Sequence, residues 1–387
     1  MSSGLLLIEQ FHPGDLFWKR VLSSENIRNP NAMWQLQRVY AKGILSRGTP
    51  ASASRKYLYG PKTNIITSRF TILPRRYSTV PDGSQQWPVD FVPTRLELKS
   101  HPLGWEVLQQ RVEPYFAQNW KFASEREKKG FLALGFSRAL NEMFPLMLDD
   151  RAELTGKMHY LALLVDDQLD KMEMSSLLQY RERVMAIARG ELSPNRNSCL
   201  EWMLHDTLTS MRSIDEVLAN DVTEGFCTLL QGQTTENRLT VRHLGPYLEY
   251  REVDVGRPFS ANLHLTSAEI KQASALESCT FRFMGAFNDI YSWEKEWKTY
   301  EENKTDGAHP FSAIFILAKE TGLSYSACKR MMLVYCRELE LAFKRSEEEI
   351  RQTSPPLRPE MIKYIRGLEY IMSGVESWTK WTPRYQT

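Results

Sequence analysis

The feature that most constrains this chain is a succession of helical patterns that begins near Trp87 and runs to the C-terminus. Apolar residues recur there at three- and four-residue spacing, which places side chains on one face of an α-helix. The stretches are 103–118, 125–144, 151–172, 174–190, 199–217, 219–235, 243–254, 267–302, 310–319, 324–352 and 358–380. Proline and glycine lie between them, and no run alternates as a half-buried strand does. We therefore predict a single all-α domain over residues 86–387.

Residues 1–85 differ in composition from the rest of the chain. Between Met1 and Asp82 there are 12 lysines and arginines against 4 aspartates and glutamates, with many serines and threonines. A basic segment of this kind is typical of an unfolded arm. We expect a flexible N-terminal extension, and its charge leaves organelle targeting open as an alternative to a cytoplasmic location.

The overall composition argues against several classes of partner. The formal net charge is +2 over 387 residues, so no basic surface for nucleic acid is indicated. No apolar run reaches the roughly 18–20 residues that a membrane-spanning helix needs. The five cysteines are scattered and form no CxxC pair, which argues against a disulfide framework or a thiolate metal site. We expect a cytoplasmic monomer or homodimer with a small-molecule substrate.

A first group of carboxylates lies near the end of the apolar stretch 151–172. Asp166, Asp167 and Asp170 form the pattern DDxxD, in which Asp166 and Asp170 share one helix face. Like charges at this spacing destabilise a helix, and the helix dipole makes acids at a C-terminus still less favourable. A hard divalent cation such as Mg²⁺ resolves the conflict, because it takes oxygen ligands and shares them with phosphates. The alternative is a solvated acidic helix end with Lys171 as its partner.

A second polar group lies within the aromatic stretch FNDIYSWEKE at 287–296. Asn288, Ser292 and Glu296 recur every four residues, so they line a stripe two turns long. Amide, hydroxyl and carboxylate oxygens together suit the coordination sphere of a hard metal ion. Lys295 lies off the stripe but can reach an anion such as a phosphate. The alternative is an ordinary polar helix face.

Together the two motifs resemble those of class I terpene synthases. That family carries DDxxD near the end of one helix and NDxxSxxxE on a later one, as this chain does at 166–170 and 288–296. The ending WTPRYQT resembles the family's C-terminal Arg-Tyr pair, here Arg384 and Tyr385. The segment YLEYREVDVG is similar to fungal sesquiterpene cyclases in particular. The resemblance extends from about Trp87 to the C-terminus.

The resemblance implies a helical barrel around a deep apolar pocket. It also implies a Mg²⁺-dependent lyase that ionises farnesyl diphosphate and cyclises the carbocation to a sesquiterpene hydrocarbon or alcohol. Three Mg²⁺ ions are expected, with Mn²⁺ as a substitute. Three alternatives stay open: a cyclase for another prenyl diphosphate such as a diterpene precursor, a chain-elongating trans-prenyltransferase, and a non-catalytic helical scaffold. The Asn-Ser-Glu character of the second motif favours cyclisation over elongation.

The same resemblance assigns roles to individual residues. The implied metal ligands are Asp166, Asp170, Asn288, Ser292 and Glu296, whereas Asp167 is expected to form salt bridges. The implied diphosphate donors are Lys295, Arg384, Tyr385 and a sensing arginine. Arg251 fits the sensor motif best, and Arg242 is its rival.

A carbocation requires a dry, apolar pocket, and aromatic faces stabilise its charge. The candidates for this lining are Phe281, Phe283, Met284, Phe287, Tyr291, His159, Phe144, Phe226 and Trp378. Each of them is also explained by ordinary core packing, so the sequence leaves the lining open.

Overall fold

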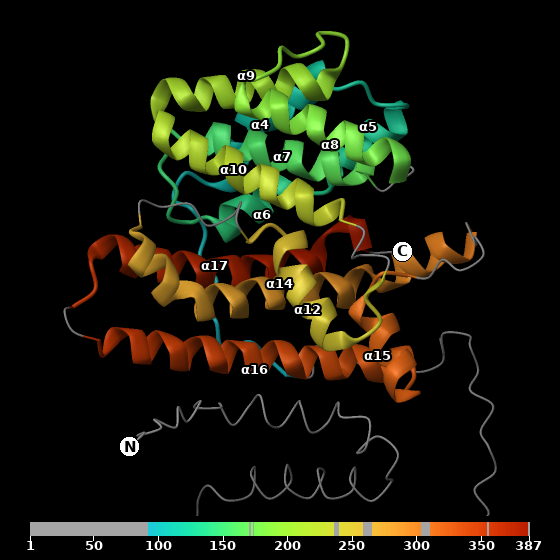
Figure 1. Cartoon of the computed structure of the whole chain (residues 1–387), viewed down its shortest axis with the longest axis vertical. Helices are drawn as coiled ribbons and strands as arrows, with labels where there is room; N and C mark the ends of the chain where they lie inside the picture. The colour runs from blue at the N-terminus through green and yellow to red at the C-terminus, as the bar shows by residue number, and fades with distance from the viewer. Residues whose placement is uncertain are drawn as a thin grey trace, which may run out of the picture. The chain divides into compact units, whose positions relative to one another are not determined.

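The computed structural model describes residues 92–169, 172, 174–235, 240–257, 265–302, 310–353 and 356–385. These residues form helices and connections, with no strand among them and no helix long and apolar enough to cross a membrane. The predicted boundary near residue 85 lies outside them. The helices in Figure 1 are α4 (Trp105–Asn119), α5 (Glu125–Ala133), α6 (Phe136–Met143), α7 (Ala152–Leu169), α8 (Met174–Arg189), α9 (Cys199–Ile214), α10 (Glu216–Gln233), α12 (Leu244–Asp254), α14 (Ser267–Glu302), α15 (Ala313–Thr321), α16 (Tyr325–Arg351), α17 (Pro359–Trp381) and the 3-10 turn η1 (Pro383–Tyr385).

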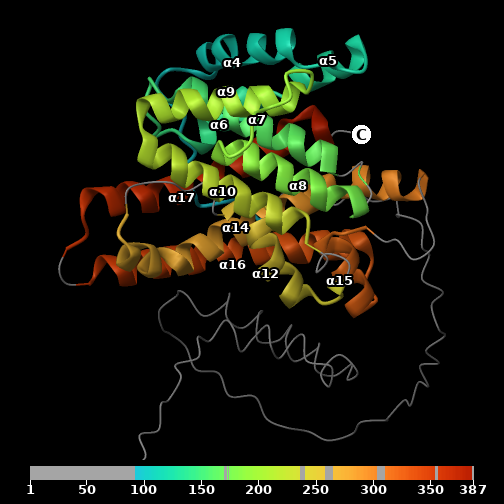
Figure 2. The same ribbon diagram turned by 45° about the horizontal axis from the view of Figure 1, so that its top comes forward.

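Helix α14 is the centre of one group of helices. It contacts α16, α17, α12 and α15, and Figures 1 and 2 show it running between α17 and α16. A second group consists of α4, α6, α7, α8, α9 and α10, which contact one another in sequence-distant pairs such as α4 with α7. Helix α6 joins the two groups because it packs against α17. The predicted all-α fold is confirmed.

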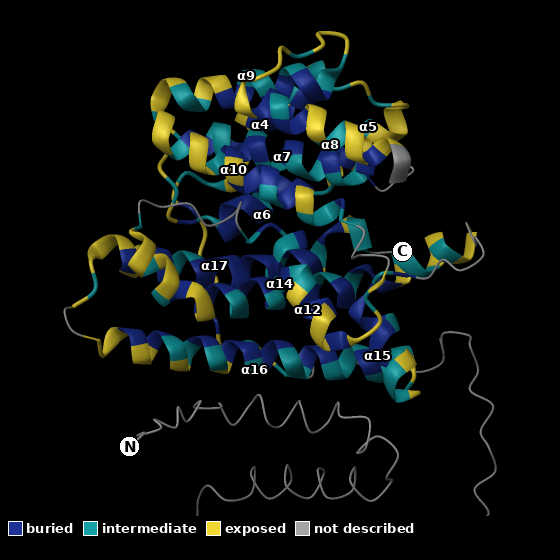
Figure 3. Cartoon of the chain, viewed as in Figure 1, coloured by how far each residue is buried: buried dark blue, intermediate teal, exposed yellow. Residues whose placement is uncertain are grey.

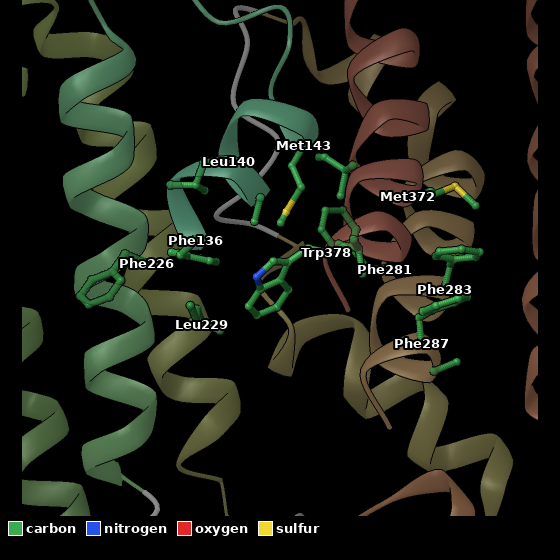
Figure 4. Close-up of a cluster of buried hydrophobic side chains, with 14 of the residues drawn as sticks. Phe136, Leu140, Met143, Phe226, Leu229, Phe281, Phe283, Phe287, Met372 and Trp378 are labelled. Carbon is green, nitrogen blue, oxygen red and sulfur yellow. The ribbon is translucent and has the colours of Figure 1, made fainter. Parts of the chain in front are cut away.

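The hydrophobic core lies where the inner faces of these helices meet. Figure 3 shows buried residues on the inward faces and exposed residues on the outer faces of α9, α10 and α16. Large buried side chains come from many of these helices, and Figure 4 labels ten of them from α6, α10, α14 and α17: Phe136, Leu140, Met143, Phe226, Leu229, Phe281, Phe283, Phe287, Met372 and Trp378. The periodic apolar pattern read from the sequence is therefore the pattern that fills this core.

Polar side chains fix where several helices begin. Ser124, Ser198, Asp215, Ser312 and Ser324 each accept a hydrogen bond from a backbone amide two or three residues later. Such N-caps satisfy amides that have no partner inside the helix, and each contributes about 1 kcal/mol. Helix boundaries are thus encoded locally, by residues outside the apolar pattern.

The prediction of one continuous helix over 125–144 was wrong. The segment divides into α5 and α6 at Leu134 and Gly135. Gly135 has a φ of 62°, a left-handed conformation that ends a regular helix and that glycine adopts without strain. The ring of Trp381 lies against its Cα atom and leaves no room for a side chain. The break therefore reflects a tertiary contact that apolar spacing does not reveal.

Helices α6 and α17 approach each other backbone to backbone at Gly374. A Cβ atom at this position would lie 2.6 Å from the backbone nitrogen of Met143 and 2.8 Å from the carbonyl carbon of Glu142. Neither atom can move without moving α6. The glycine is therefore required for this contact between α6 and α17. Helix α17 leads directly to the C-terminal turn.

Gly374→Ala should lower the free energy of unfolding by about 1–3 kcal/mol, because the added methyl group forces two backbones apart. The matched control is Gly367→Ala in the same helix, where a Cβ atom would meet nothing within 4 Å. This control should leave the stability unchanged or raise it by up to about 1 kcal/mol, since alanine has the higher helix propensity. Denaturant titration followed by circular dichroism measures both, and equal stabilities would contradict the proposed close approach.

Candidate metal and diphosphate site

The first acidic motif lies at the C-terminal end of α7. Asp166 accepts a hydrogen bond of 2.9 Å from Nε2 of Gln233, at the end of α10. Asp167 is bound by Arg384, whose Nη2 atom lies 2.9 Å from Oδ1. Asp170 lies outside the described residues. The two adjacent carboxylates thus have different partners, in keeping with their separation of about 100° around the helix.

The second motif lies on one face of α14. Ser292 donates a hydrogen bond of 2.6 Å to Oε1 of Glu296, whereas Oε2 of Glu296 is buried and has no hydrogen-bond partner. Burial, followed by the nearby Asp289 carboxylate, raises the pKa of Glu296 to about 7. Asn288 donates from Nδ2 to the hydroxyl of Tyr385 at 2.7 Å. This face therefore offers one buried carboxylate oxygen, Oε2 of Glu296, to which no hydrogen bond is donated.

The C-terminal turn η1 contacts both motifs. Arg384 binds Asp167 of α7, and the next residue, Tyr385, binds Asn288 of α14. Two consecutive residues can span only a short distance, so the end of α7 and the stripe on α14 must lie close together. The ring of Tyr385 also packs edge-on against Trp378, with 5.8 Å between centroids. The structure thus brings the two motifs and the C-terminal pair into one site.

Arg251 of α12 completes the second motif. Its Nη2 atom lies 3.0 Å from Oδ1 of Asn288 and 3.0 Å from Oδ1 of Asp289, and its Nη1 atom binds Asp254. Burial alone would lower the pKa of Arg251, but Tyr247 and the two carboxylates raise it well above its usual range. The guanidinium therefore remains a cation inside the protein.

Two further basic candidates have different positions. Arg242 is exposed, and its Nη1 atom donates a hydrogen bond of 3.0 Å to the carbonyl of the preceding residue, Val241. The structure therefore brings Arg251, and not Arg242, to the second motif. Lys295 is partly exposed on α14 beside Glu296, and its charge, with that of Arg251, opposes the rise in the pKa of Glu296.

The donor set fits a hard divalent cation. The candidate ligands are carboxylate, amide and hydroxyl oxygens, and both Oε2 of Glu296 and Oε1 of Gln233 are buried without a hydrogen-bond partner. Among the described residues, no group of three or more His, Cys, Asp or Glu side chains could by itself hold a metal. A metal here would therefore depend on oxygens of mixed type, including Asn288 and Ser292.

Sequence reasoning missed three polar residues of this site. Gln233 gave no signal, because a single glutamine at a helix end belongs to no pattern. Asp289 was part of the quoted motif but received no role, and Tyr247 of α12 resembled an ordinary core residue. In the structure the hydroxyl of Tyr247 donates a hydrogen bond of 2.6 Å to Oδ2 of Asp289. Only the packing of α12 on α14 reveals this pair.

The aromatic candidates fall into two places. Phe281, Phe287, Phe226 and Trp378 are buried in the core of Figure 4. Phe283, Phe287 and Tyr291 form a stack along α14, with centroids 5.1 and 5.3 Å apart, and Met284 lies partly buried against the same core.

Phe144 and His159 lie elsewhere, in an apolar pocket. Their rings are 4.8 Å apart, and burial lowers the pKa of His159 to about 4, so its imidazole is neutral.

That pocket has a volume of about 280 Å³ and is lined mainly by apolar residues. Its walls come from the segment 143–148, from the C-terminal end of α9 and from the N-terminal halves of three helices, α7, α10 and α17. The C-terminal ends of the same three helices lead to Asp166, Gln233 and Arg384. The pocket and the polar site therefore occupy opposite ends of one set of helices.

Comparison with known proteins gives a consistent assignment. Residues 157–340 match the model of terpene synthase family 2, C-terminal metal binding. The chain is 36% identical over 323 residues to an aristolochene synthase of Penicillium rubens, covering 81% of this chain and 91% of that one. It is 34% identical over 304 residues to the aristolochene synthase of Aspergillus terreus, covering 76% and 93%.

A solved structure agrees with these sequence matches. The crystal structure of aristolochene synthase from Penicillium roqueforti superimposes with a TM-score of 0.66 at 35% identity, over 75% of this chain and 99% of that one. The matched metal-binding region contains both motifs, at 166–170 and 288–296. Since identity above 30% extends over most of both sequences, this chain belongs to the terpene synthase family.

Proposed function

We propose that the chain is a class I sesquiterpene cyclase that ionises farnesyl diphosphate and cyclises the resulting carbocation. The observation that carries the proposal is the contact of one C-terminal turn with both oxygen-rich motifs, through Arg384 to Asp167 and Tyr385 to Asn288. The names of the relatives, aristolochene synthases, support a sesquiterpene product. The product class is a sesquiterpene hydrocarbon or alcohol, released together with diphosphate.

Divalent metal use follows from the family, and we propose Mg²⁺ as the ion, with three bound and Mn²⁺ as a substitute. Asp166, assisted by Asp170, would hold ions at the first motif, and Asn288, Ser292 and Glu296 would hold one at the second. When bound, the ions supply positive charge that neutralises the leaving diphosphate. The unpartnered Oε2 atom of Glu296 supports this assignment.

Three protein cations and one tyrosine hydroxyl would stabilise the diphosphate as it leaves. Arg251, Lys295, Arg384 and Tyr385 would donate hydrogen bonds to its oxygens, where negative charge develops. Arg384 is held by Asp167 at 2.9 Å. Asp167 is thus its partner in the free protein, and the remaining N–H groups of the guanidinium can donate to the diphosphate.

The carbocation must be shielded from water, which would quench it. Trp378 and Phe281 are buried and belong to helices that carry or contact η1, so their rings are suited to stabilise the cation near the leaving group. Released diphosphate can accept the proton lost in forming a hydrocarbon. No separate protein base is then required.

We further propose that the hydrocarbon chain extends toward the apolar pocket. Thr155 lines that pocket 11 residues before Asp166 (166 − 155), which is about 16 Å along a helix. Gly367 lines it from α17, with open space where a side chain would lie. Phe144 and His159 would then contact the end of the chain that is distant from the diphosphate.

Asp166→Asn and Asn288→Ala should each reduce turnover of farnesyl diphosphate by roughly 10²–10³-fold, because each removes an oxygen ligand or charge at the ionisation step. The control is Glu294→Gln on α14, an exposed residue paired with Lys329. It should retain activity. Gas chromatography of the volatiles measures turnover, and circular dichroism checks folding. Full activity in a folded Asp166 or Asn288 variant would refute that assignment.

Gly367→Leu should reduce turnover of farnesyl diphosphate by about tenfold, because the new side chain fills the space proposed for the distal isoprene unit. Turnover of the shorter geranyl diphosphate should change by less than about twofold. Gly130→Leu in α5 is the matched control, since a Cβ atom there also meets nothing within 4 Å. Equal losses with both substrates would show that the chain does not reach this pocket.

A further inference from the structure

Asp289 lies in the second motif but off the metal-binding stripe. It follows Asn288 on α14 and is rotated from it by about 100° around the helix. It is 1% exposed, so it is enclosed by protein on all sides. Its carboxylate therefore interacts with neighbouring helices, and the proposed ligands Asn288, Ser292 and Glu296 lie on the adjacent face.

The Asp289 carboxylate joins three helices. Its Oδ1 atom accepts a hydrogen bond of 3.0 Å from Nη2 of Arg251 on α12. Its Oδ2 atom accepts two hydrogen bonds, one of 2.6 Å from the hydroxyl of Tyr247, also on α12, and one of 2.7 Å from the backbone nitrogen of Ala313. Ala313 is the first residue of α15, where the positive end of the helix dipole stabilises a carboxylate. Three donors thus fix this side chain in one orientation.

The Nη2 atom of Arg251 donates hydrogen bonds to two acceptors at the same distance. The distances to Oδ1 of Asn288 and to Oδ1 of Asp289 are both 3.0 Å. In the proposed function, Oδ1 of Asn288 is also the atom that faces a metal ion. A guanidinium and a metal ion would then compete for the same oxygen, because both are positively charged.

Asp254 cannot resolve this competition. It binds the other terminal nitrogen of Arg251, but it lies only three residues later on the same helix. A contact within α12 moves with α12 and does not fix the guanidinium relative to α14. Among the described residues that contact Arg251, Asp289 is the carboxylate that belongs to α14.

We propose that Asp289 is a positioning residue that keeps the guanidinium of Arg251 beside the diphosphate site when Asn288 exchanges Arg251 for a metal ion. This inference rests on the proposed function of the site. Asp289 contacts neither the substrate nor the metal. It acts through Arg251, and its bonds to Tyr247 and Ala313 hold its carboxylate in place while the Asn288 contact is lost.

Asp289→Asn is the informative substitution because an amide accepts on only one of its two terminal atoms. The Ala313 amide can only donate, so the oxygen of the new side chain must face it. The amide nitrogen then faces Nη2 of Arg251, donor against donor. Glu277→Gln is the matched control, because Glu277 is a buried carboxylate on the same helix that pairs with Arg257 and lies outside the second motif.

The experiment measures the rise in melting temperature of the full chain as inorganic diphosphate is added at saturating Mg²⁺. Asp289→Asn should weaken the apparent diphosphate affinity by about tenfold, as expected for a lost hydrogen bond to a charged group. Glu277→Gln should lower the melting temperature without ligand but keep the affinity within about twofold. If Asp289 acts through Arg251, Arg251→Ala should abolish the effect of Asp289→Asn in the double variant.

The outcomes separate this inference from the function on which it rests. A wild-type chain that does not respond to diphosphate would overturn both. A wild-type response together with an unchanged affinity in Asp289→Asn, or with additive losses in the double variant, would overturn the inference alone. Where Asp289→Asn does not melt cooperatively, a crystal structure of the unaltered chain with Mg²⁺ and diphosphate decides. Nη2 of Arg251 must then still lie within hydrogen-bond distance of Oδ1 of Asp289, and loss of that contact refutes the proposal.

Discussion

An excess of negative charge at the meeting point of α7, α12 and α14 is the constraint on which the site depends. Among the residues that the structure describes there, the carboxylates are Asp166, Asp167, Asp254, Asp289 and Glu296, and the cations are Arg251, Lys295 and Arg384. These carboxylates outnumber the cations by five to three. The excess of two negative charges lies in partly buried surroundings, where unpaired charge is costly. The raised pKa of Glu296 is one response to that cost. Divalent cations bound through these oxygens would remove it more completely.

The fold holds the C-terminal turn where both motifs can use it. The carbonyl of Leu134 accepts hydrogen bonds of 3.1 Å from Nε1 of Trp378 and of 3.1 Å from the hydroxyl of Thr382. These bonds attach the end of α17 to the break between α5 and α6, beside Gly135. The position of Arg384 and Tyr385 therefore depends on a turn far away in sequence. The close approach at Gly374 aligns the same two parts of the fold.

Much of this architecture could be predicted from the sequence because periodicity reports directly on which residues share a helix face. Spacing of four residues grouped Asn288, Ser292 and Glu296, and the two motifs together identified the family. Spacing along one helix does not show what another helix places opposite it. The pairing of Gln233 with Asp166 and the choice between Arg251 and Arg242 therefore required the structure. The break at Gly135 was missed for the same reason, since the ring of Trp381 that packs against this glycine comes from another helix.

The apolar part of the site shows the same limit in another form. Aromatic side chains at helical spacing serve equally well as core or as cavity wall, and the sequence does not distinguish these uses. The structure separates Phe144 and His159, at the pocket, from Phe226 and Phe281 in the core. Residue type alone predicted an apolar interior. Where that interior leaves an open cavity depends on small residues such as Gly367.

The central claim is that the motifs on α7 and α14 bind metal jointly with diphosphate. Electron paramagnetic resonance of free Mn²⁺ tests it directly, by counting the ions that the protein retains with and without inorganic diphosphate. The account predicts diphosphate-dependent retention that is lost when either Asp166 or Asn288 is replaced. Undiminished diphosphate-dependent retention after either replacement would contradict it, because each motif would then bind its ions without the other.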